Sequence, residues 1–287
     1  MDSRVSVFPL TALLLGLLGC RPLFDMTVYE ESLLSLSEQG VAQASEILGQ
    51  SIVSSELVSA GIPPGVYADY GAFLTQQGKT AEAVAYFAKE GEKYPESKKV
   101  VRQLQAIIQK TNTDQDLQIE SVSHPTPSIF ILPTLNETGK PEAGQAFDFT
   151  LSRQFIERGY YVFPTVATRM LLKNAGMNFG DASGIKISSI RSLTGADSVL
   201  YVTVTEWKKA WVVLPLVRVK AEYRLVDSST GEEIWRSTVT DQYDPTVSVG
   251  SGATLGHMTQ DFRIPARSLT RKALRATENG LPYGPYH

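Results

Sequence analysis

Cysteine, histidine and positive charge are all scarce in this 287-residue sequence. The single cysteine cannot form an internal disulfide, and none of the three histidines has a second histidine or cysteine at metal-ligand spacing. Basic residues number 27 against 30 acidic ones, so the formal net charge is −3. This balance gives no general attraction to nucleic acid. We therefore expect no metal, no cofactor and no nucleic-acid partner.

Motifs for nucleotide binding and for serine hydrolysis are missing as well. Gly78-Lys79-Thr80 is similar to the end of a phosphate-binding loop, but Phe73 stands where the first glycine belongs. The loop 250–256 misses the dinucleotide fingerprint by one residue, and no Gly-x-Ser-x-Gly elbow occurs. We expect no catalytic residues. Scattered carboxylates leave open an acid-base pair whose position the spacing cannot give.

The one long apolar run covers Val5–Leu18 and follows a single cation, Arg4. It is short for a transmembrane helix and typical of a signal-peptide core. The run ends in Leu17-Leu18-Gly19-Cys20, which resembles the bacterial lipobox, whose cysteine is lipidated and becomes the first residue after cleavage. We expect a lipoprotein signal peptide over residues 1–19 and a lipid on Cys20. An ordinary secretory signal with a chance cysteine is the alternative.

The lipid expected on Cys20 bears on where the mature chain resides. Two or more acyl chains anchor a protein stably, whereas a single chain binds a membrane only marginally. Arg21 follows the cysteine, where an aspartate would favour retention in the inner membrane. We therefore expect a chain anchored in the cell envelope, at the outer membrane and facing the periplasm.

Residues 20–110 have a helical pattern. Over Pro64–Ser97 the pattern matches one tetratricopeptide repeat, a pair of antiparallel helices. Small side chains at Gly71 and Ala83 let such helices approach, and aromatic side chains fill the gap between them, namely Tyr67, Tyr70 and Phe87. One repeat cannot bury its own face, so residues 31–48 and 98–110 are expected to supply packing helices. A plain helical hairpin without repeat ancestry is the alternative.

A polar passage over residues 111–118 is the expected linker to an α/β domain over residues 119–287. Ile129–Leu132 is a continuous apolar run, typical of a central strand covered on both faces. Helical spacing over Phe147–Ile156 then leads to a second strand. Between Val217 and Leu225 apolar and charged residues alternate, as in a strand with one buried face.

The remaining elements complete the expected architecture. Helices are expected at 165–173, 187–193 and 265–278, and strands at 160–163, 197–206, 216–226 and 232–240. The class is α+β multidomain: a tetratricopeptide-like helical hairpin domain, followed by an α/β domain with a mixed sheet flanked by helices.

Two sets of motifs resemble families of bacterial lipoproteins of unknown function. Residues 22–110, with Pro63–Gly71 and Tyr94–Ser97, resemble a small tetratricopeptide-like lipoprotein family. Residues 119–287 resemble the neisserial surface-lipoprotein family. Its motifs occur here in order, at Gly159–Pro164, Gly195–Trp207, Ala221–Asp227, Gly231–Trp235 and Leu281–His287.

The resemblance implies that two proteins, usually encoded separately beside a lipoprotein similar to the curli secretion channel, are joined in one chain. It further implies an α/β domain similar to the N-terminal domain of the periplasmic Tol-system β-propeller protein. A role in an envelope secretion or transport assembly follows from it, with a curli-secretion-channel-like lipoprotein as the expected partner.

Two surfaces are candidates for binding a partner. Arg267, Arg271 and Arg275 recur every four residues, which places three cations on one face of the last helix. A merely solvated helix face is the alternative. Trp207 and Trp211 form an aromatic patch, with core packing as the alternative.

Together these observations favour a non-enzymatic envelope accessory protein. It would bind proteins through both the helical repeat and the α/β domain. The alternatives are an envelope enzyme, such as a hydrolase of cell-wall or surface polymer, and a purely structural lipoprotein. A surface cleft with convergent carboxylates of raised pKa would favour the enzyme.

Overall fold

The structure is a computed structural model that describes residues 23–109, 128–177, 185–211, 215–243, 263–276 and 280–286, with only the backbone for 209–211 and 215–216. Its first part is helical, and each helix packs on the next. The helices are α1 (Met26–Glu38), α2 (Val41–Leu57), α3 (Val66–Gln76), α4 (Thr80–Lys93) and α5 (Lys98–Gln109), with the short 3-10 helix η3 (Pro95–Ser97) before α5.

The contact between α3 and α4 has the packing that the sequence predicts. A Cβ atom added to Gly71 would lie 3.0 Å from Cε1 of Phe87, so only glycine allows this aromatic ring to sit so close to α3. Ala83 and Phe87 are completely buried. The predicted roles of Gly71, Ala83 and Phe87 are therefore confirmed. The expected packing segment 31–48 spans the turn at Gly40, which separates α1 from α2.

The second part contains a mixed sheet, as predicted. Its strand order is β3-β1-β4-β5-β6, with β2 paired to β4. Strand β1 runs parallel to β3 and to β4, whereas β4, β5 and β6 form an antiparallel meander. The strands are β1 (Ser128–Ile131), β2 (Leu135–Asn136), β3 (Tyr161–Val162), β4 (Ser198–Trp211), β5 (Pro215–Asp227) and β6 (Glu233–Tyr243).

Helices cover both faces of the parallel end of this sheet. They are α6 (Pro141–Glu157), α7 (Thr165–Asn174), α8 (Ile187–Thr194) and α9 (Arg263–Arg275). Successive strand residues point to opposite faces: Ile129 packs in one core with α6 and α9, and Phe130 in the other with α7 and α8. β1 is therefore the central, doubly covered strand that its apolar run predicts.

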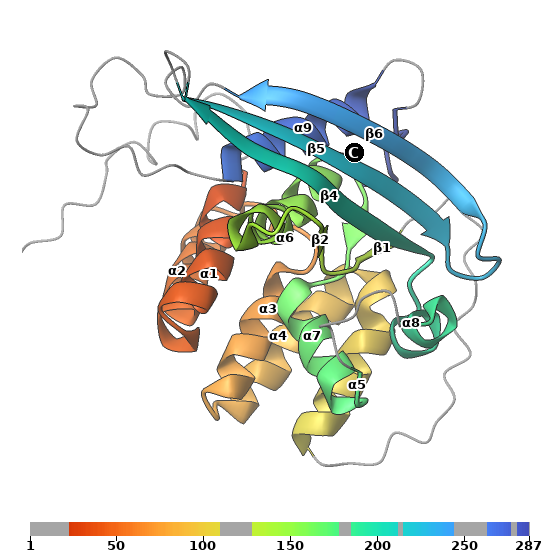
Figure 1. Ribbon diagram of the computed structural model, residues 1–287. Helices are drawn as coiled ribbons and strands as arrows, with labels where there is room; N and C mark the ends of the chain where they lie inside the picture. The colour runs from red at the N-terminus through yellow and green to blue at the C-terminus, as the bar shows by residue number, and fades with distance from the viewer. Residues whose placement is uncertain are drawn as a thin grey trace, which may run out of the picture.

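The helical part and the α/β part share one of these cores. Buried residues of α1 to α5 belong to the same cluster as Phe130, Tyr161 and Leu171. Every second helix of the helical part makes the contact: α1 packs on α6, α3 on α7, and α5 on both α7 and α8. Figure 1 shows α7 among α3, α4 and α5. One face of the helical part, formed by α1, α3 and α5, is thus covered by the chain's own α/β part.

Candidate functional site

The crevice at the carboxyl ends of β1 and β3 is the position where an α/β fold would be expected to bind a ligand. In α/β folds ligands bind outside the carboxyl ends of parallel strands, beside helix N-termini. A hollow lies there, with room for about one or two water molecules. Its walls come from the end of β1, from α6 and from the start of α7: Phe130, Ile131, Leu132, Pro133, Asp148, Ser152, Thr165, Thr168 and Arg169.

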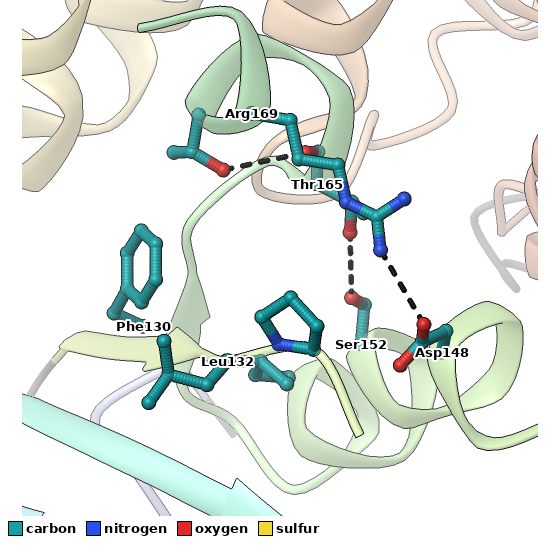
Figure 2. A pocket seen from close by; sticks show the side chains of 9 residues that line it. Phe130, Leu132, Asp148, Ser152, Thr165 and Arg169 are labelled. Carbon is teal, nitrogen blue, oxygen red and sulfur yellow. Dashed lines mark hydrogen bonds and ion pairs between the residues drawn. The ribbon is translucent and has the colours of Figure 1, made fainter. Parts of the chain in front are cut away.

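The polar groups of this hollow are paired with one another (Figure 2). The guanidinium of Arg169 lies 3.5 Å from a carboxylate oxygen of Asp148, whose other oxygen accepts the backbone N–H of Thr134 at 2.8 Å. The hydroxyls of Ser152 and Thr165 are 3.4 Å apart. Burial raises the pKa of Asp148, and the charge of Arg169 opposes this rise. Among the described lining residues Asp148 is the only carboxylate, whereas glycoside hydrolysis requires two.

The N-terminus of α7 is already occupied. Helix N-termini attract anions because their first N–H groups lack helical partners. Oδ1 of Asp69, on α3, accepts the N–H groups of Val166 and Ala167, both at 2.8 Å. Oδ2 accepts the N–H of Thr165 at 3.1 Å and the hydroxyl of Tyr29 at 2.6 Å. The side chain of Asp69 therefore takes the place that a phosphate or carboxylate ligand would occupy.

Asp69 caps α7 because the chain beside α7 cannot. The N-cap position is Pro164, and no side chain there accepts a hydrogen bond. In an ordinary helix the N-cap side chain accepts these N–H groups, whereas in α7 the acceptor is Asp69 from another part of the chain. Its complete burial raises the pKa of the carboxyl to about 6, and its four hydrogen-bond donors oppose this rise.

A second buried carboxylate, Glu90 of α4, joins the same two parts. Oε1 accepts the N–H of Gly65 at 2.8 Å and the hydroxyl of Tyr161, on β3, at 3.2 Å. Gly65 has a φ of +84°, and a Cβ there would lie 3.2 Å from the carbonyl oxygen of Val162. Glycine thus permits both the left-handed backbone and the close approach to β3. Burial is the main cause that raises the pKa of Glu90 to about 7; the nearby Asp69 contributes to this rise, and the hydrogen bonds from Gly65 and Tyr161 oppose it.

A third buried carboxylate, Glu30 of α1, pairs with two arginines of the α/β part. It accepts a hydrogen bond from Arg267 of α9, and Arg153 of α6 lies 3.9 Å away. The side chain of Glu30 is completely buried. A buried carboxylate that lost both arginines would be strongly destabilising, so the contact depends on all three residues.

The C-terminal segment ties the two parts together from outside. The N–H groups of Gly284 and Tyr286 donate to the carbonyls of Arg158 and Gly159. The hydroxyl of Tyr286 donates to Glu96 of the helical part at 2.5 Å. The segment 280–286 thus bridges the end of α6 and η3.

The aromatic patch predicted at Trp207 and Trp211 is divided by the structure. Trp207 is 4% exposed and belongs to the core beneath α6 and α9. It cannot offer its ring to a partner, so core packing, the alternative reading, holds for Trp207. Trp211 lies at the end of β4, and its side chain is outside the described residues.

The arginine stripe is also divided. Arg267 is engaged with Glu30, so it serves the contact between the two parts. Arg271 and Arg275 are exposed on α9. Only these two cations of the predicted stripe face solvent.

Several predictions fall on residues that the structure leaves out. Cys20, the linker 111–118 and all three histidines lie outside the described ranges. Within the described ranges, no three His, Cys, Asp or Glu side chains are arranged to hold a metal ion. In the same ranges no helix is long and apolar enough to cross a membrane.

Two family models match the chain. The one described as "Putative lipoprotein GNA1162-like" matches residues 117–260, just over half of the sequence. The other, "Domain of unknown function (DUF4810)", matches residues 23–104. The chain belongs to the GNA1162-like lipoprotein family. The predicted combination of two family segments in one chain is confirmed.

Parts of the chain are also similar to individual proteins. The chain is 34% identical over 110 residues to "Putative lipoprotein NMB1124/NMB1162" of Neisseria meningitidis serogroup B, covering 38% of this chain and 51% of that protein. The chain thus spans about half the length of this curated relative. The crystal structure of lipoprotein GNA1162 from Neisseria meningitidis is 31% identical, covers 45% of this chain and 89% of that one, and has a TM-score of 0.40. A PelC dodecamer from Paraburkholderia phytofirmans is 19% identical, covering 52% and 85%, with a TM-score of 0.37.

The three buried carboxylates were missed at the sequence level, although a signal for them exists. Glu90 follows Phe87 by three residues and Ala83 by seven, which places it on the buried face of α4. Asp69 precedes the buried Phe73 by four residues in the same way. A carboxylate on an apolar helix face needs a partner elsewhere in the fold, but spacing does not identify that partner.

Proposed function

We propose that this family member is a non-enzymatic accessory protein of the cell envelope, anchored by a lipid on Cys20, that binds an envelope partner as one rigid body. The observation that carries the proposal is the crevice at the ends of β1 and β3, which has room for only about one or two water molecules. Asp69 fills the anion position at α7, and Asp148 and Arg169 pair with each other. Among the described residues, the chain's own side chains thus occupy the positions where a ligand would be expected, which supports a role through the outer surface.

Two buried carboxylates bear on the alternative of an envelope hydrolase. Asp69 and Glu90 have the raised pKa values expected of catalytic acids, but both are completely buried. Their hydrogen-bond donors come from the same chain, and a substrate cannot reach them without opening the fold. Their raised pKa values therefore reflect burial at an internal contact.

The packing of the helical part argues against peptide binding in a groove of its helices. The faces of α3 and α5 that would line such a groove contact α7. We infer that partner contact uses the remaining outer surface, with the exposed pair Arg271 and Arg275 as first candidate and Trp211 as second. A secretion or transport assembly with a curli-secretion-channel-like lipoprotein is the partner system that the family resemblance favours.

Lipid anchoring is tested on the purified membrane protein. Mass spectrometry of the mature N-terminus should show an acylated Cys20 as first residue, since residues 17–20 form a lipobox. An unmodified chain that begins at another residue would contradict the anchor.

Partner binding is tested by co-purification in mild detergent. The variant Arg271→Glu/Arg275→Glu reverses two exposed charges. If the partner is acidic, most of it should no longer co-purify, because charges at the edge of an interface guide association. Lys140→Glu/Lys186→Glu is the matched control, since it reverses two exposed cations on other elements. Equal partner recovery with both variants would exclude this face of α9 as the binding surface.

A further inference from the structure

A cluster of exposed apolar side chains lies at the C-terminal end of α2. Leu57 is 81% exposed, Val53 is 51% exposed and Val58, the C-cap residue, is 46% exposed. Val53 and Leu57 are four residues apart, so they share one face of the helix. These three side chains leave an unusual amount of apolar surface in water at a single helix end.

Leu23 extends this cluster and connects it to the N-terminal segment. Leu23 is 89% exposed, and its backbone forms a parallel bridge to Gly61, three residues after Val58. We call Leu23, Val53, Leu57 and Val58 the apolar end. Half of the large exposed hydrophobic residues in the described part of the chain belong to it; the others lie on other elements, at Leu135, Ile234, Tyr283 and Tyr286.

The turn after α2 holds the apolar end in a defined shape. Ser59 has a φ of +55°, a left-handed conformation that is uncommon for a residue with a side chain. The N–H of Ala60 donates to the carbonyl of Ser55 at 2.8 Å, which closes the end of the helix. The neighbouring residue Phe24 is buried, so the chain on the other side of Leu23 is fixed as well.

The sequence around the apolar end carries few charges. Between Ser51 and Pro64 the only ionisable side chain is Glu56, and the rest are apolar or small and polar. Glu56 is paired with Lys89 at 2.8 Å and accepts the hydroxyl of Tyr67 at 2.9 Å. A surface of this kind fits the uncharged boundary between lipid headgroups and acyl chains better than an acidic or basic protein.

The distance to the lipid anchor decides between possible occupants. Leu23 is three residues after Cys20, a separation that an extended chain spans in at most about 11 Å. An acyl chain on Cys20 therefore holds the apolar end within reach of the membrane surface. Figure 1 shows α1 and α2 side by side at one side of the molecule, where α1 packs on α6.

We propose that the apolar end enters the surface of the lipid bilayer beside the lipid on Cys20 and orients the folded protein on the membrane. This inference rests on the proposed lipid anchor. It goes further, because a tether alone leaves the domain free to rotate, whereas several inserted side chains fix which face points to the aqueous side. The face carried by α9 would then keep one orientation toward a partner.

The unusual cysteine content allows a direct test. In the acylated protein the thiol of Cys20 is consumed, so one introduced cysteine is the only free thiol. Leu57→Cys and, separately, Val53→Cys are labelled with an environment-sensitive fluorophore. Ile234→Cys on β6, 43% exposed in the wild type, is the matched control. Each acylated variant is reconstituted into phosphatidylcholine vesicles with and without bromine on the acyl chains.

The expected result is a blue-shifted emission and at least about twofold quenching by brominated lipid at positions 57 and 53, with neither effect at position 234. Quenching at none of the positions in protein that floats with the vesicles would overturn the membrane contact and keep the anchor. Equal quenching at all three would also overturn it. A blue shift without quenching would mean that protein, such as a second copy, covers the apolar end. Protein that fails to float would contradict the anchor itself.

Discussion

The helical part and the α/β part contribute opposite groups to the contact between them. The helical part supplies buried acceptors, the carboxylates of Glu30, Asp69 and Glu90. The α/β part supplies most of the donors: the N-terminus of α7, the hydroxyl of Tyr161 and the guanidinium of Arg267. Neither part satisfies its buried polar groups alone, which indicates that the two family segments fold as one unit.

The apolar surfaces of the two parts lead to the same conclusion. Without α3 and α5, the buried side chains Val166, Ala167 and Leu171 of α7 would be exposed to water. Without the α/β part, Asp69 and Glu90 would lose partners on α7 and β3. Mutations inside the helical part and mutations at the contact between the two parts can therefore be compared by the unfolding free energy that each one removes.

Removing internal packing of the helical part should have the largest effect. Phe87→Ala deletes a completely buried ring between α3 and α4 and should lower the free energy of unfolding by roughly 3 to 5 kcal/mol. A urea titration of the mature chain carrying Cys20→Ser measures this change. A loss under about 1 kcal/mol would mean that the ring does not hold these helices together.

Removing the shared cap of α7 should have the next largest effect. Asp69→Ala leaves the N–H groups of Thr165, Val166 and Ala167 without their acceptor, and we expect a loss of about 2 to 4 kcal/mol. The same urea titration measures it.

Asp69→Asn is the matched control for this cap. It keeps one carbonyl oxygen for the donors of α7 but turns an amide group toward the others, so its loss should be smaller than that of alanine. A loss with Asp69→Ala no larger than that of an ordinary surface substitution, about 0.5 kcal/mol, would contradict the capping role.

Local pattern was enough to predict the elements but not the contacts between them. The apolar run of β1 and the alternation in β5 identified strands, because burial of a strand face depends on neighbours two residues apart. Asp69 and the first turn of α7 are separated by about a hundred residues, and no periodicity links them. β2 was missed because Leu135–Asn136 stands in no apolar run, whereas the two residues of β3 lie within the apolar run 160–163. Trp207 was ambiguous because a tryptophan serves equally well in a core and on an interface.

The contact at Glu90 should make the unfolding free energy depend on pH, and this effect should be smaller than the losses expected for Phe87→Ala and Asp69→Ala. The pKa of Glu90 is raised from 4.5 to about 7 in the folded protein, so the folded state binds more protons than the unfolded state between these values. Stability is then greatest below the unfolded pKa and is lost as the pH rises through about 7. Glu90→Gln should remove roughly 1 to 3 kcal/mol of this dependence.

The measurement is the unfolding free energy at several pH values from 5 to 8, for the wild type and for Glu90→Gln. The variant should show a flatter profile, and Asp69, whose pKa is also raised, accounts for the residual slope. Identical slopes in both proteins would contradict a buried, protonatable Glu90.

Cooperative unfolding of the two parts tests the central claim most directly. All three tryptophans, Trp207, Trp211 and Trp235, lie in the α/β part, whereas α1 to α5 contribute strongly to far-UV circular dichroism. In a guanidinium titration of the mature Cys20→Ser chain, both signals should follow one transition with a single midpoint, and Asp69→Ala should shift both by the same amount. Two separated midpoints, with Asp69→Ala shifting only one of them, would show that the helical and α/β parts are independent domains.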